Sequence, residues 1–155
     1  MLKITIIAVG KLKERYWREA VDEYLKRLKP YVRVDVIEVP DAPDSLGENE
    51  ARTREGEGIV RALPDGAHVV LLDIVGKQRS SEGLAQHIDN LAVQGVSHIA
   101  FVIGGSHGAS ERVRSAVKET LSFGAITLPH NLARVVLVEQ LYRVCRISRN
   151  EPYHK

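Results

Sequence analysis

The sequence has one cysteine, Cys145, in a chain of 155 residues. A single cysteine excludes an intramolecular disulfide and a zinc site made of several cysteines. Long hydrophobic runs are also missing, because the longest, residues 4–9 and 135–138, are too short to cross a bilayer. There is also no apolar core followed by a small-residue cleavage site, the pattern of a signal peptide. We therefore expect a cytoplasmic protein.

An excess of charge of one sign is likewise missing. The chain has 22 Lys and Arg against 20 Asp and Glu, a formal net charge of +2. This balance does not by itself indicate a nucleic-acid partner. Basic residues gather in residues 11–33 and 132–155, which fits either solvated helix faces or a contact surface. The length predicts a single domain, residues 1–155, with one buried core.

Strand-like and helix-like segments alternate along the chain. Apolar runs rich in β-branched residues predict strands at residues 2–9, 32–39, 68–74, 98–103 and 125–128. Helical spacing predicts helices at residues 14–28, 48–63, 81–94, 111–122 and 131–148. The last three helices would be capped by Ser80 or Ser81, by Ser110 and by Asn131, respectively. A turn is predicted at Gly76-Lys77. The alternation predicts an α/β fold, a mostly parallel sheet flanked by helices.

A glycine-rich loop, VIGGSHG at residues 102–108, follows one predicted strand. Dinucleotide-binding loops have glycines at relative positions one, three and six, whereas here they stand at one, two and five. No Lys-Ser or Lys-Thr pair follows, as a phosphate-binding P-loop requires. Two interpretations remain open: a close approach of the backbone to some other ligand, or a plain tight turn.

A second candidate segment is FGAITLPH, residues 123–130. Its small and apolar residues, broken by Pro129 before a helix, would suit a flat apolar ring. The alternative is a buried edge strand with a helix-starting turn. Ligands of open α/β sheets bind at the carboxyl ends of the strands. This segment, the glycine loop and the Leu71-Leu72-Asp73 strand end could therefore face one cleft.

Several ordered segments together resemble one known family. They are IxxIAVGKLK at the start, LDIxGK and SSEGLAQ in the middle, VIGGSxG, and LPHxxxRVVLxEQLYRxxxIxxxEPYHK at the end. The chain resembles over nearly its whole length the RlmH-type pseudouridine N3-methyltransferases of large-subunit ribosomal RNA, members of the SPOUT (trefoil-knot) methyltransferase superfamily. Knots are nearly absent among folds. The C-terminal trefoil knot is therefore implied by the resemblance alone.

The resemblance also implies a cofactor and an assembly. The cofactor is S-adenosylmethionine, and no metal is expected. Carried over by position, the cofactor site comprises Leu72, Gly104, Gly105, Phe123, Gly124, Ala125, Ile126, Thr127 and Leu128. The family works as a homodimer, with the last helix near the interface and each site completed by the partner. That would account for the apolar run at residues 135–138.

The implied reaction is methylation of N3 of a pseudouridine in helix 69 of 23S ribosomal RNA within assembled ribosomes. Tyr153 and His154 of the closing motif are candidates for removing the N3 proton, although a disordered tail is the alternative. Arg134 could bind an RNA phosphate or the cofactor carboxylate, or have a structural role at the dimer interface.

Two other functions remain open. One is a non-catalytic ribosome-binding factor with a methyltransferase fold, and the other is a nucleotide-binding α/β enzyme. His68, His87 and His98 do not have the spacing of a metal triad, so we expect no metal site.

Overall fold

The computed structural model describes residues 1–155. Its strands are β1 (Lys3–Val9), β2 (Arg33–Val39), β3 (His68–Gln78), β4 (His98–Ile103) and β5 (Glu119–Ser122). Its helices are α1 (Arg15–Leu28), α2 (Glu48–Ala62), α3 (Ser81–Val93), α4 (Glu111–Ala116) and α5 (His130–Ser148). Strands and helices alternate, as the sequence predicts.

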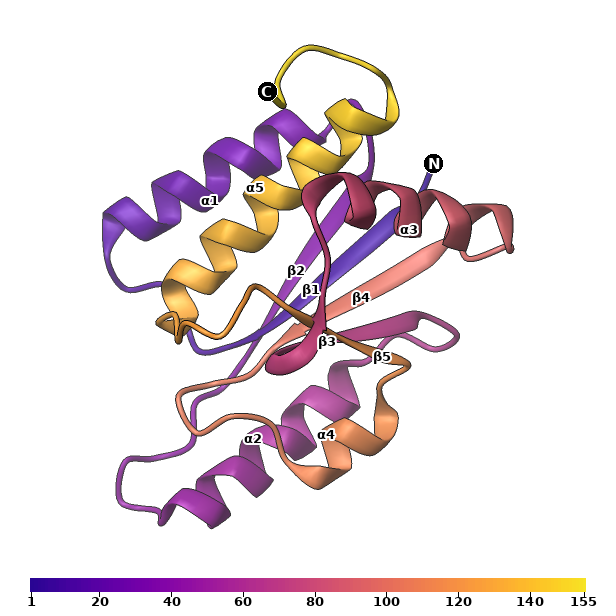
Figure 1. Ribbon diagram of the computed structural model, residues 1–155. Helices are drawn as coiled ribbons and strands as arrows, with labels where there is room; N and C mark the ends of the chain where they lie inside the picture. The colour runs from indigo at the N-terminus through magenta and orange to yellow at the C-terminus, as the bar shows by residue number, and fades with distance from the viewer.

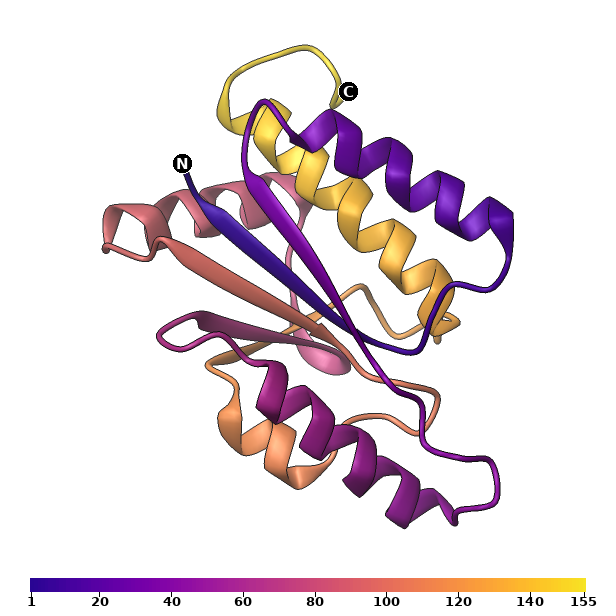
Figure 2. The ribbon, with the colours of Figure 1, turned by 180° about the vertical axis from the view of Figure 1, so that it is seen from behind.

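The strands form one parallel sheet in the order β2-β1-β4-β3-β5. Helices α1, α3 and α5 cover one face, and α2 and α4 cover the other (Figure 1; Figure 2 shows the same layers from behind). Successive side chains of a strand point to opposite faces. In β1, Ile4 and Ile6 therefore pack under the three-helix layer, and Ile7 and Val9 pack under α2 and α4.

Two predicted helix caps are confirmed. Ser80 Oγ accepts a hydrogen bond from the Gly83 N–H at 2.9 Å, and Ser110 Oγ accepts one from the Val113 N–H at 3.3 Å. Each serine thereby satisfies one of the free N–H groups of the first helical turn. The predicted cap Asn131 is wrong, because α5 begins one residue earlier and follows Pro129.

The fifth strand lies earlier in the chain than the sequence predicts. Residues 125–128 are not a strand, and the helix predicted to reach residue 122 ends at Ala116. The strand is Glu119–Ser122, which pairs with the edge of β3. Leu121 and Ser122 are buried by this pairing, whereas Ile126 remains 79% exposed. Tertiary pairing has thus decided between two segments of similar local propensity.

The predicted turn at Gly76-Lys77 is also wrong, since both residues lie within β3. Leu72 and Lys77 both register with Leu121, so the residues between them bulge out of the ladder. The bulge brings Gly76 against β5. A Cβ at this position would lie 2.9 Å from the backbone N of Leu121. Glycine is required here by close approach of two backbones.

Helix α5 is buried on several sides, as its apolar sequence predicts. It packs beside α1 and α3, with Leu137, Val138, Leu141 and Val144 in the core. Its partly exposed residues include Val135 and Val136.

No helix of this fold has both the length and the apolar composition needed to span a membrane.

Cys145 lies on α5, and burial raises the pKa of its thiol to about 11. Because the thiolate is the reactive form, we expect the native thiol to react with a disulfide reagent at pH 8 about tenfold more slowly than in the unfolded chain, since the higher nucleophilicity of a more basic thiolate offsets part of its lower population. The rate should rise about tenfold per pH unit until the pH approaches 11. Absorbance with an aromatic disulfide, in buffer and in urea, measures both rates for this one thiol. Equal rates in the two conditions would show that Cys145 is not buried.

Candidate functional site

A cavity of about 600 Å³ opens at the carboxyl ends of β3, β4 and β5. Three segments form most of its wall: the β3 bulge, the glycine loop after β4, and residues 123–129 after β5. The lining residues predicted from the sequence are Leu72, Gly104, Gly105, Phe123, Gly124, Ile126, Thr127 and Leu128. Ala125 is the one predicted cofactor residue that is not among them. Three segments far apart in the sequence are thus brought to one cleft.

The glycine loop forms a tight turn, and its backbone also lies close against neighbouring side chains. The N–H of Gly108 donates to the carbonyl of Gly105 at 3.1 Å, which closes the turn. A Cβ on Gly105 would lie 2.8 Å from Glu55 Oε1 and 3.2 Å from Val9 Cγ1. The loop is therefore pressed against the sheet and α2, and its exposed side faces the cavity.

Glu55 supports this loop from behind. Its side chain is 5% exposed, and Oε2 accepts a hydrogen bond from the Ala42 N–H at 3.0 Å. Oε1 has no hydrogen-bond partner and is the atom nearest to a Cβ at position 105. The carboxylate thus joins the loop after β2 to α2, and a larger residue at position 105 would have to displace it.

Asp73 and Arg114 place both signs of charge at the cavity wall. Arg114 comes from α4 and forms an ion pair with Asp73 of the β3 bulge. The first residue of α5, His130, also lines the cavity. Sequence reasoning placed Asp73 near the cleft but gave no role to Arg114, because an exposed arginine in a short helix carries no distinguishing signal.

These residues fit S-adenosylmethionine. The cavity lies within the roughly 300–1,000 Å³ range of small-molecule sites. Leu72, Leu121 and Leu128 offer an apolar wall for a flat ring. Asp73 and Arg114 offer opposite charges to a ligand that carries an ammonium and a carboxylate. Glycines at residues 104 and 105 leave backbone groups accessible beside the ring.

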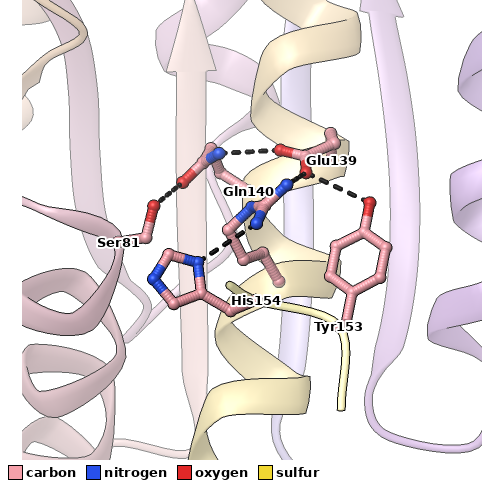
Figure 3. A network of polar contacts seen from close by, with 6 residues as sticks. Ser81, Glu139, Gln140, Tyr153 and His154 are labelled. Atoms are coloured by element: carbon pink, nitrogen blue, oxygen red, sulfur yellow. Dashed lines mark hydrogen bonds and ion pairs between the residues drawn. The ribbon is translucent and has the colours of Figure 1, made fainter.

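The C-terminal tail is ordered against its own chain. Tyr153 donates a hydrogen bond to Glu139 Oε1 at 3.2 Å, and His154 lies between Arg143, at 3.1 Å, and Glu82, at 2.5 Å. Figure 3 shows the part of this network around Tyr153, His154 and Glu139, which Gln140 extends to Ser81. Burial raises the pKa of Tyr153 to about 12, so the phenol keeps its proton at neutral pH.

Tyr153 and His154 do not line the cavity of their own chain. The cavity meets α5 at His130, and the tail follows the other end of this 19-residue helix. At 1.5 Å per residue the helix is about 28 Å long. Figure 1 shows the tail at the end of α5 opposite to its start. If these residues act at such a cavity, it is that of a second copy.

A family model described as "Predicted SPOUT methyltransferase" matches residues 2–154. The chain belongs to the SPOUT methyltransferase family. Two relatives named "Ribosomal RNA large subunit methyltransferase H" are similar over whole chains. The one from Bacillus cytotoxicus is 52% identical over 159 residues and the one from Bacillus thuringiensis 51%; each alignment covers 99% of this chain and 100% of the relative.

The fold of this SPOUT methyltransferase also resembles a solved structure, the tRNA (m1G37) methyltransferase from Aquifex aeolicus. The TM-score is 0.56 at 17% identity, with 99% of this chain and 74% of the other covered. At this identity the likeness concerns the fold alone. The predicted α/β fold is confirmed, and the family match and the structural likeness agree with the expected trefoil knot.

Arg134 of this SPOUT methyltransferase is 2% exposed. Its Nη1 donates to Glu38 Oε2 at 2.6 Å, and its Nη2 donates to the Gly10 carbonyl at 3.1 Å. The guanidinium thereby ties α5 to the ends of β1 and β2. Burial and partners inside the same chain favour a structural role of Arg134 over RNA binding, which stays a prediction.

Replacing Arg134 by alanine should destabilise the protein by about 3 kcal/mol, since Glu38 and the Gly10 carbonyl lose their partner. For a chain of this length, that corresponds to a fall in Tm of roughly 6–12 °C. Thermal unfolding measures it, with Arg33→Ala on the exposed edge strand as control. An unchanged Tm together with weaker ribosome binding would restore the RNA-binding interpretation.

Proposed function

We propose that this chain transfers the methyl group of S-adenosylmethionine to N3 of a pseudouridine in helix 69 of 23S ribosomal RNA within assembled ribosomes. The observation that carries the proposal is the cavity formed by the β3 bulge, the glycine loop and residues 123–129. It belongs to a SPOUT methyltransferase whose full-length relatives are named as methyltransferases of large-subunit ribosomal RNA.

When bound, S-adenosylmethionine supplies an electrophilic methyl group on a positively charged sulfur. The task of this chain is then to align the methyl group with N3 of the base. Leu72 and Leu128 would hold the flat ring, and the backbone at Gly104 and Gly105 would contact its edge. Asp73 and Arg114, which now pair with each other, would bind the charged ends of the ligand. The target base must leave its stack to reach the cavity.

The N3 proton needs an acceptor near the cavity. His130 lines the cavity of its own chain, and Tyr153 and His154 reach it only from a partner. We assign the proton to His154 of the partner's tail, in a cytoplasmic homodimer, because the phenol of Tyr153 keeps its own proton at neutral pH. Exposed apolar residues beside the cavity support this assembly: Val75 is 83% exposed, Ile126 79%, Ile74 43% and Phe123 36%. A second copy would cover this surface.

Methyl transfer from radiolabelled S-adenosylmethionine should label ribosomes that lack this modification, and the label should map to a pseudouridine of helix 69. Free ribosomal RNA is the control and should gain little label, because the proposed target is the assembled surface. If the protein binds S-adenosylmethionine but the ribosomes gain no label, the substrate is a different RNA. Ribosome binding without cofactor binding would favour the non-catalytic factor.

Truncation after Asn150 should abolish methylation and leave S-adenosylmethionine binding within about threefold, since the tail does not line its own cavity. A second variant, Gly104→Trp, should lose cofactor binding. A Cβ there already contacts the backbone of Gly108 at 3.4 Å, so an indole would displace the glycine loop that lines the cavity. When both chains are co-expressed, mixed dimers contain one intact cavity facing one intact tail. Random pairing then restores roughly a quarter of wild-type activity.

The matched control for the tail is Lys155→Ala, which keeps Tyr153 and His154 and should remain active. Two inactive variants that stay inactive together would show that the tail does not serve a partner. Full activity of the truncated chain would remove Tyr153 and His154 from the mechanism.

A further inference from the structure

Three side chains with metal-binding donors meet at the amino ends of β3 and β5. They are His68 at the start of β3, His87 on α3 and Glu119 at the start of β5. One donor atom of each lies within 4.8 Å of the other two. Their spacing in the sequence indicates no metal triad, because the three elements meet only in the folded chain.

Strand register explains how the cluster forms. Val70 of β3 stands opposite Glu119 of β5. His68 lies two residues before Val70, so His68, Val70 and Glu119 point to the same face of the sheet. On that face Val70 packs in the core cluster that includes Leu84, Ile88 and Leu91 of α3. His87 precedes Ile88 on α3, the helix that covers this face of the sheet, and adds the third side chain to the cluster.

The contacts converge on one carboxylate. His68 Nε2 lies 2.6 Å from Glu119 Oε2, and His87 Nε2 lies 2.9 Å from both carboxylate oxygens. The carboxylate of Glu119 thus lies between the two imidazoles, with a ring nitrogen of each within hydrogen-bond distance.

Burial is partial and suits a bound ion. The three side chains are 18–22% exposed, so solvent reaches the cluster from one side. On the inner side, His87 and Glu119 border a small apolar cavity lined by Leu84, Ile88 and Phe101. An apolar inner wall with an open outer side leaves one coordination position for water.

We propose that His68, His87 and Glu119 form a binding site for one Zn²⁺ ion, with a water molecule as the fourth ligand. Two histidine nitrogens and one carboxylate oxygen are a donor set that zinc accepts in a tetrahedral arrangement. With metal–ligand bonds of about 2.0–2.2 Å, tetrahedral donors stand roughly 3.4 Å apart. To reach that separation, the 2.6 Å distance from His68 to Glu119 opens by about 0.8 Å and the 2.9 Å distance from His87 by about 0.5 Å. Each imidazole then carries its proton on Nδ1.

The ion would tie together α3, β3 and the short edge strand β5. It lies at the amino ends of β3 and β5, whereas the cavity uses their carboxyl ends. The inference goes beyond the proposed methyl transfer and does not depend on it. The function of the ion would be to fix the edge strand β5, which the cavity needs, rather than to take part in the reaction.

The test uses untagged, metal-stripped, full-length protein at pH 7.5. Zn²⁺ competition with a chelating dye should give one equivalent per chain, and Co²⁺ should give the intense visible absorption of a low-symmetry four-coordinate site. His87→Gln and Glu119→Gln should each weaken binding about 100-fold or more. His107→Gln, a histidine outside the cluster, should bind as the wild type does.

A readout that needs no variant is also available. A hundredfold excess of Zn²⁺ over its Kd should raise the Tm of the wild type by about 5–10 °C. X-ray absorption of the zinc-loaded protein should show two imidazole ligands. Unchanged affinity in Glu119→Gln, or a zinc spectrum without imidazole, would overturn the proposal. So would a wild type that binds less than one equivalent and shows no change in Tm.

Discussion

The pairing of β5 with β3 is the constraint on which the rest of the structure depends. Leu121 registers with both Leu72 and Lys77, so the chain between them must bulge outward. The bulge requires glycine at residue 76, where the backbones of the two strands nearly touch. It presents Leu72 and Asp73 to the cavity, and it places Phe123 and the following residues opposite the glycine loop. Without this pairing, two of the three main walls of the cavity would be lost.

The same two strands have different chemistry at their two ends. Their carboxyl ends hold small and apolar residues with the Asp73–Arg114 ion pair, which suits a compact charged ligand with a flat ring. Their amino ends hold His68 and Glu119, which meet His87 in a set of metal-binding donors. In parallel sheets the carboxyl end is the usual place for a ligand. The amino end is available for stabilising interactions of a short edge strand.

Helix α5 separates the cavity from the C-terminal tail. It begins at His130 in the cavity wall, and it ends before Tyr153 and His154, which contact Glu139, Arg143 and Glu82. Buried Arg134 fixes the start of the same helix to Glu38 and Gly10. A rigid helix of this length keeps the tail from its own cavity. In the proposed homodimer, a second chain would supply its tail beside the exposed Ile126 and Val75.

The sequence by itself determined the elements whose signals are local. Alternating apolar runs set β1 to β4, serine caps set the starts of α3 and α4, and the glycine loop and residues 123–130 identified most of the cavity wall. Tertiary structure decided what depends on residues far apart in the sequence. Residues 119–122, rather than 125–128, became the edge strand because β3 offered them a partner. Arg134 became a buried partner of Glu38. His68 and Glu119 were brought together by strand register, and the packing of α3 added His87. Local propensity cannot determine these features, because their energy comes from contacts that exist only after the chain has folded.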